Sequence, residues 1–175
     1  LHGHEINYIP DIIKVQTKQA KIRVLTLNEE KNLLHYLKNH FDLTALGILL
    51  SLFTGLRIGE LCTLRWSDFS LSEKVIHVRR TMQRLHNLDE NSEKRTSIEI
   101  GDPKSSSSIR IIPIPDKLLK YIQTAYVEDA YVLSGEQNRF IEPRTMENRF
   151  KRVLRKCGIK KLIFTLFVIH SLQNA

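Results

Sequence analysis

The chain is poor in cysteine and in long apolar runs. Its two cysteines, Cys62 and Cys157, lie far apart in apolar helical contexts, so we interpret them as small buried hydrophobic residues rather than a disulfide framework. This usage favours a reducing, cytoplasmic setting. Residues 1–20 contain no apolar signal-peptide core, and the most apolar stretch, 43–53, is too short to cross a bilayer. We therefore expect neither a membrane segment nor a targeting signal.

The composition is that of an ordinary globular protein with an excess of positive charge. The 175 residues are 42% hydrophobic and 26% charged, enough for one domain with its own core. Because the first residue is Leu1 rather than methionine, we expect a piece of a longer protein. Lys and Arg exceed Asp and Glu by eight, and the pI is near 9.6. That balance suits a polyanionic partner, although a basic surface without such a partner is equally compatible with charge alone.

Hydrophobic periodicity predicts an α+β fold, mainly helical with a small three-stranded antiparallel sheet. Thr26 and Glu29 match a capping box that opens a helix over 27–39. The stretch 43–53 predicts a helix that is buried on all sides, ended by a left-handed turn at Gly55. A short helix is expected at 57–64, and further helices are expected to be capped by Asp116 and opened by Pro143. Strands are expected at 75–79, 96–100 and 109–114, with a mobile loop at 81–95.

The last of these helices carries a basic face. Arg149, Lys151, Arg152, Arg155 and Lys156 lie away from its apolar side. Such a face could contact phosphate, but charge runs on helices are usually solvated, and we favour that interpretation.

Arg57 is the unusual residue, because it follows a core helix within two residues of Gly55. A guanidinium there stays charged, and it needs anionic or carbonyl partners to offset the water it loses. One interpretation is a structural arginine paired with Glu60, three residues along the same helix. The other is an oxyanion clamp, since the planar guanidinium grips phosphate with two parallel hydrogen bonds.

The sequence around Arg57 resembles a known family signature. The segment Thr54-Gly55-Leu56-Arg57-Ile58-Gly59-Glu60-Leu61, followed by Leu64-Arg65-Trp66-Ser67-Asp68, is similar to the first box of the tyrosine recombinases, or phage integrase family. The resemblance covers about residues 25–160. It implies that the complete parent cleaves one strand of double-stranded DNA through a 3′-phosphotyrosine and rejoins it to a new partner, as a tetramer on DNA and without a metal or nucleotide cofactor. Arg57 would stabilise the phosphorane charge, and Glu60 would support Arg57.

Lys104 is the only cation of the turn at 101–108. Its composition alone predicts a solvated lysine at a loop tip. In the family that the chain resembles, a lysine in this hairpin acts as general acid for the leaving 5′ hydroxyl, and Lys104 matches that position. An ammonium group with a lowered pKa can donate such a proton.

The tail departs from the family pattern. A His-x-x-Arg-His box and then a nucleophilic tyrosine should follow Gly158, but Thr165, Val168 and Ile169 hold the places of the box. The last tyrosine, Tyr131, precedes that region, so no nucleophile is assigned in this chain and we expect no strand cleavage.

We hypothesise that a shifted reading frame explains this departure. Residues 164–175 can be encoded so that the frame one base earlier reads Phe-His-Ala-Leu-Arg-His-Ser-Leu-Ala-Thr-Lys-Cys, which contains the missing box. We therefore expect a linker at 1–24, a partial catalytic domain at 25–160 and a frameshifted or aberrant tail at 161–175. Two alternatives stay open: the chain is a non-catalytic basic DNA-binding module, or it is a non-functional remnant.

Overall fold

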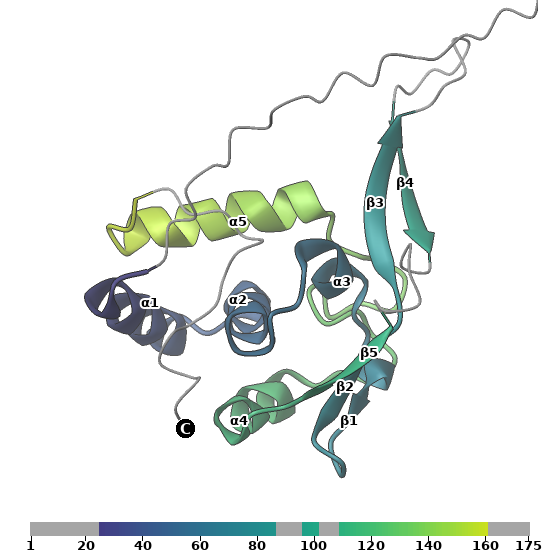
Figure 1. Cartoon of the computed structure of the whole chain (residues 1–175), viewed down its shortest axis with the longest axis horizontal. Helices are drawn as coiled ribbons and strands as arrows, with labels where there is room; N and C mark the ends of the chain where they lie inside the picture. The colour runs from purple at the N-terminus through teal and green to yellow at the C-terminus, as the bar shows by residue number, and fades with distance from the viewer. Residues whose placement is uncertain (1–24, 87–95, 102–108, 161–175) are drawn as a thin grey trace, which may run out of the picture.

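Helix α2 (Leu43–Thr54) lies at the centre of the molecule, and the other four α-helices of its described part all pack against it. The computed structural model describes residues 25–86, 96–101 and 109–160 (Figure 1). Residues 45–52 of α2 are all buried, as expected for a helix that is apolar on every side. Figure 1 looks along α2, with α5 above it, α4 below it and α1 beside it. The prediction of a buried central helix is confirmed.

The surrounding helices begin and end where local signals place them. Helix α1 (Leu27–Asn39) opens with the predicted capping box, in which the Glu29 N–H donates to Thr26 Oγ1 at 3.3 Å and the Thr26 N–H donates to Glu29 Oε2 at 3.0 Å. Helix α5 (Pro143–Lys156) has its proline in the first turn, and Gly158 follows it with φ +69°. Helix α3 (Ile58–Thr63) is short and follows α2 closely.

Helix α4 (Asp116–Ala125) corrects one expectation. Its N-cap residue is Pro115, and Asp116 is the first helical residue rather than the cap. The Asp116 carboxylate instead accepts a hydrogen bond of 2.8 Å from Lys74 Nζ. The helix packs on the core through Leu118 and Ile122, which are both fully buried.

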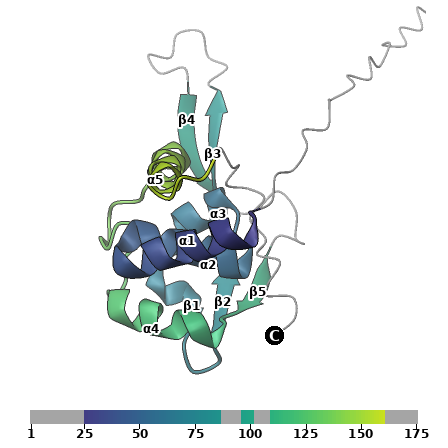
Figure 2. The same cartoon turned by 90° about the vertical axis from the view of Figure 1, so that its left-hand side faces the viewer.

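The α+β class is confirmed, but the strands are grouped differently from the prediction. The three-stranded antiparallel sheet consists of β1 (Phe69–Ser70), β2 (Val75–Val78) and β5 (Arg110–Pro113), with Ile76 opposite Ile112. Strand β4 (Thr96–Gly101) pairs instead with β3 (Thr81–His86) in a separate antiparallel hairpin. The hairpin extends away from the helices (Figure 2).

The loop predicted at 81–95 is therefore wrong over its first six residues, which form β3. The polar residues of this segment suggested a loop, but Met82 on β3 is buried against the core. Long-range pairing with β4 and packing against α3 compensate for the weak local signal.

The cysteines and the chain ends complete the comparison with the sequence analysis. Cys62 is buried, and that burial, followed by the charge of Glu147, raises the pKa of its thiol to about 12. Cys157 is half-buried, and burial also raises its pKa; both cysteines are free. Within the described ranges, no helix is long and apolar enough to cross a membrane. The expected linker at 1–24 and tail at 161–175 lie outside the described residues.

Candidate active site

The turn after α2 places Arg57 at the start of α3. Gly55 adopts the left-handed conformation with φ +67°, as its position in the sequence predicts. The Ser51 hydroxyl donates a hydrogen bond of 2.9 Å to the carbonyl of Leu56, which fixes the turn from inside the core. Arg57 is consequently the N-cap residue of α3, with an extended backbone.

Glu60 is the acceptor at the centre of the site. Its side chain is only 3% exposed. It accepts hydrogen bonds from the Arg57 N–H at 2.8 Å and from Arg57 Nη1 at 3.1 Å. It also accepts two bonds of 2.8 Å from Arg110, with Nη1 donating to Oε1 and Nη2 to Oε2. This fork is the stronger geometry, because two parallel charge-assisted bonds fix both groups.

The sequence analysis did not assign Arg110 to the site. Arg110 begins β5, fifty positions after Glu60 in the chain. Strand alternation was the available signal, because it places Arg110 on the same face as the buried Ile112, whereas Ile109 and Ile111 are exposed. The prediction that Glu60 supports Arg57 needs this addition: Glu60 is itself held by Arg110.

Arg57 is more open to water than its core context suggested. Its side chain is 63% exposed, so the expected loss of hydration is wrong. The left-handed turn at Gly55 explains the difference, since the chain leaves the buried helix before Arg57 is reached. In the described part of the chain, one of the five guanidinium N–H donors is used, in the bond to Glu60.

The charge balance at the site favours an anion. Arg57 and Arg110 contribute two positive charges and Glu60 one negative charge, which leaves one net positive charge. Burial would raise the pKa of Glu60, but hydrogen bonds from Arg110 and Arg57 outweigh it and hold the pKa below its usual 4.5. The same hydrogen bonding raises the pKa of Arg110. Glu60 therefore stays ionised at neutral pH, and Arg57 stays oriented.

Gly59 allows α3 to approach β3 closely. A Cβ at this position would come within 2.6 Å of the Met82 carbonyl oxygen and 2.7 Å of Thr81 Oγ1. The Thr63 hydroxyl lies on the same side and donates a bond of 3.0 Å to the Arg80 carbonyl. Arg57 and Glu60 are thus carried on a helix that is fixed against the hairpin.

Lys104 lies in 102–108, outside the described residues, so its predicted role stays a prediction. The segment that carries it joins β4 to β5, and β5 delivers Arg110 to Glu60. Among the described residues, no group of three or more His, Cys, Asp or Glu side chains is placed to hold a metal ion.

Comparison with known proteins identifies the family of this fold. The phage integrase family model matches residues 23–173. A tyrosine recombinase XerC-like protein of Caldanaerobacter subterraneus subsp. tengcongensis is 28% identical over 158 residues, which cover 81% of this chain and 40% of that protein. The chain therefore spans less than half of that relative.

Solved structures share the fold at low sequence identity. The crystal structure of XerA recombinase matches with a TM-score of 0.56 and 21% identity, over 81% of this chain and 46% of that one. A Tn1549 transposon integrase in complex with a circular intermediate DNA matches with a TM-score of 0.61 and 20% identity, over 85% and 50% of the two chains.

Proposed function

The chain belongs to the phage integrase family, and from this premise we propose that it is part of a site-specific DNA recombinase in which Arg57 binds the phosphate at the point of strand exchange. The observation that carries the proposal is the arrangement at Glu60, where one buried carboxylate meets two guanidinium groups. Within the described residues, Arg57 uses one guanidinium donor, in its bond to Glu60, so most of its donors are available to an external anion.

The proposed chemistry is a transesterification at phosphorus. A tyrosine phenolate oxygen of the complete recombinase forms a bond to phosphorus while the bond to the 5′ oxygen breaks, which leaves a 3′-phosphotyrosine. Arg57 donates hydrogen bonds to the non-bridging oxygens as their charge increases. Lys104 transfers a proton to the leaving 5′ oxygen, and the rejoining step reverses these transfers.

Glu60 and Arg110 act as positioning residues in this scheme. Glu60 holds the Arg57 backbone and side chain, and Arg110 fixes Glu60 in turn. The guanidinium is therefore oriented before DNA arrives, so little reorganisation is needed at the moment of reaction.

The chain as printed is proposed to be inactive in strand cleavage, because residues 161–175 contain neither the His-x-x-Arg-His box nor a tyrosine. We propose that these residues are a shifted reading of the box. Resequencing the coding DNA from the codon for Gly158 onward tests this directly. One further base, followed by an open frame through the box to a tyrosine, is the expected result; confirmation of the present bases would exclude a sequencing error.

The mechanism is tested in a protein whose reading frame has been restored. Incubated with a nicked duplex that carries its element's own ends, this protein should form a covalent adduct that survives denaturation in detergent. Arg57→Ala should reduce the initial rate of adduct formation by about 10² to 10³, the usual loss for one oxyanion donor. Arg155→Ala is the matched control, because Arg155 is an exposed arginine on α5 outside the site.

The possible results separate the recombinase from the other functions. Absence of an adduct with the restored protein would contradict the proposed chemistry. If the chain is a non-catalytic DNA-binding module, it should bind duplex DNA sequence-specifically by itself and form no adduct. Its affinity for DNA should not change with Lys104→Ala. A non-functional remnant would neither bind nor react.

A further inference from the structure

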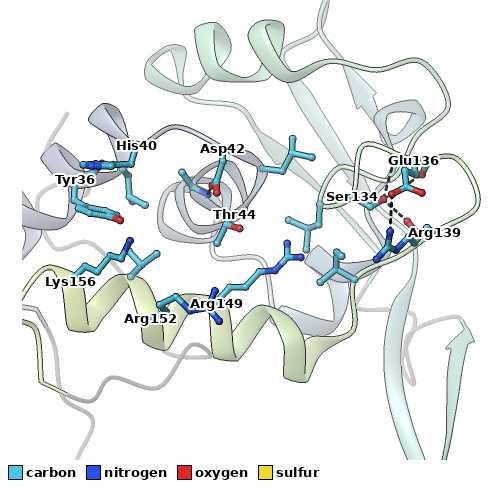
Figure 3. Close-up of a pocket in the computed structure, with 16 residues that line it drawn as sticks. Tyr36, His40, Asp42, Thr44, Ser134, Glu136, Arg139, Arg149, Arg152 and Lys156 are labelled. Carbon is cyan, nitrogen blue, oxygen red and sulfur yellow. Dashed lines mark hydrogen bonds and ion pairs between the residues drawn. The ribbon is translucent and has the colours of Figure 1, made fainter.

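A groove of about 680 Å³ lies between α5 and the junction of α1 with α2 (Figure 3). We call it the α1–α5 groove. Helix α5 contributes Arg149, Arg152 and Lys156 to one wall, and Tyr36 of α1 and His40, which follows α1, lie on the other. Its size is in the range of ligand-binding clefts.

The α1–α5 groove lies at the opposite end of α2 from Arg57. Residues 42–45, at the beginning of α2, line the groove, whereas Arg57 follows the last residue of that helix. A helix of 12 residues is about 18 Å long. The groove is therefore a separate surface from the site proposed to bind the reacting phosphate.

The lining is rich in positively charged side chains. Arg149, Arg152 and Lys156 are three and four positions apart, so they form one row along α5. Neither Arg149 nor Arg152 has an ion pair or hydrogen bond within the described residues. Both carboxylates of the lining are engaged: Asp42 Oδ1 accepts the Ala45 N–H at 2.7 Å, and Glu136 pairs with Arg139 at 3.2 Å.

The groove also has apolar lining that a phosphate backbone would not use. Leu43 and Val153 are half-buried apolar residues that line it, and Val153 lies between the basic residues of α5. On the facing wall, the rings of Tyr36 and His40, at the end of α1, are stacked with their centroids 4.3 Å apart. Apolar side chains together with a row of cations complement a segment that carries both apolar and acidic side chains.

We propose that the α1–α5 groove binds an acidic peptide segment of a partner protein. The apolar side chains of the segment lie against Leu43 and Val153, and its carboxylates pair with Arg149 and Arg152. The charge row of α5, which the sequence analysis interpreted as a solvated face, is then one wall of a docking surface. The inference does not depend on the phosphate chemistry proposed for Arg57.

The test uses a fluorescein-labelled probe peptide of about 14 residues, with leucine at every third or fourth position and glutamate between. Its affinity for the chain is measured by fluorescence anisotropy. The double variant Arg149→Glu, Arg152→Glu should weaken binding by at least about tenfold, because two attractive contacts become repulsive. Arg155→Glu makes the same type of charge change on the same helix outside the groove, and should weaken binding no more than about twofold. A probe with serine in place of leucine should also bind more weakly.

Three results would overturn the proposal. One is an equal loss of affinity in Arg155→Glu, which would indicate unspecific charge attraction. The second is full retention of binding by the serine probe. The third is competition by duplex DNA: if duplex DNA displaces the peptide, and if the double variant weakens DNA binding as much as peptide binding, the groove is a DNA surface.

A measurement on the unsubstituted chain keeps the proposal testable if the double variant does not fold. In ¹⁵N–¹H correlation spectra, the probe should shift the amide signals of groove residues such as Thr44, Leu133 and Val153. Shifts concentrated at Arg57 and Glu60 instead would place the peptide at the other end of α2 and contradict the proposal.

Discussion

Glu60 shows how one side chain can organise a surface site. Its carboxylate is buried, yet it is fully hydrogen-bonded by Arg57 and Arg110. Buried charges are costly unless they are paired in this way. The exposed guanidinium of Arg57 is thus held by a residue that water barely reaches.

This pairing makes the stability of the chain depend on pH. The folded-state pKa of Glu60 is below its ordinary value, so the unfolded state binds the proton more readily. The stabilisation is complete above the unfolded-state pKa and is lost as the pH falls through the folded-state pKa. Glu60→Gln should lower the free energy of unfolding by about 2 to 3 kcal/mol near neutral pH. The difference from the unsubstituted chain should shrink below about pH 4.

Urea denaturation at several pH values measures this difference. Glu73→Gln is the control, because Glu73 is exposed in the turn between β1 and β2. If Glu60→Gln and Glu73→Gln had the same pH profile, Glu60 would not be the linked group.

At the scale of elements, the close contact between α3 and β3 fixes the site on the scaffold. The helix that carries Glu60 approaches the backbone of β3 at Gly59, and β4, the hairpin partner of β3, begins ten positions after β3 ends. A six-residue helix has little stability of its own. Its position therefore depends on the strand beside it.

Gly59→Ala tests that dependence. The added methyl group would meet the backbone oxygen of Met82, which cannot move as a flexible side chain would. We expect a loss of about 1 to 3 kcal/mol in the free energy of unfolding, the usual cost of overpacking. Gly101→Ala is the control, because a Cβ there would meet nothing within 4 Å. Equal unfolding midpoints for the two variants would show that α3 can shift without cost.

For the whole molecule, the positive charge is distributed over surfaces with different proposed partners. The chain carries a net charge of +8, and the two proposed binding surfaces are at opposite ends of α2. Net charge alone predicts attraction to any polyanion. The position of each arginine, rather than the total charge, should determine which partner that arginine binds.

The salt dependence of DNA binding separates the two surfaces. The logarithm of the binding constant for duplex DNA should fall with the logarithm of salt concentration, by roughly 0.9 for each phosphate contact. Arg57→Ala should reduce the magnitude of that slope by about one. Arg149→Ala should leave it unchanged, because Arg149 lines the α1–α5 groove. Equal slopes for Arg57→Ala and the unsubstituted chain would remove Arg57 from the DNA contact.

Much of the fold follows from short-range patterns. The capping box at Thr26, the apolar run of α2, the left-handed turn at Gly55 and the proline of α5 each depend on residues a few positions apart. Local sterics and backbone hydrogen bonding decide such features, so the sequence by itself determined them. It also determined the family, through the continuous segment around Arg57, and Glu60 as the neighbour of Arg57.

Only the tertiary structure decided the rest, because those contacts join residues far apart in the chain. Arg110 reaches Glu60 across fifty positions, β3 pairs with β4 rather than remaining a loop, and the α1–α5 groove joins helices at the two ends of the described chain. Hydrophobic burial drives these elements together without direction. Side-chain packing and paired charges then determine which elements contact each other, and the periodicity of the sequence does not predict these contacts.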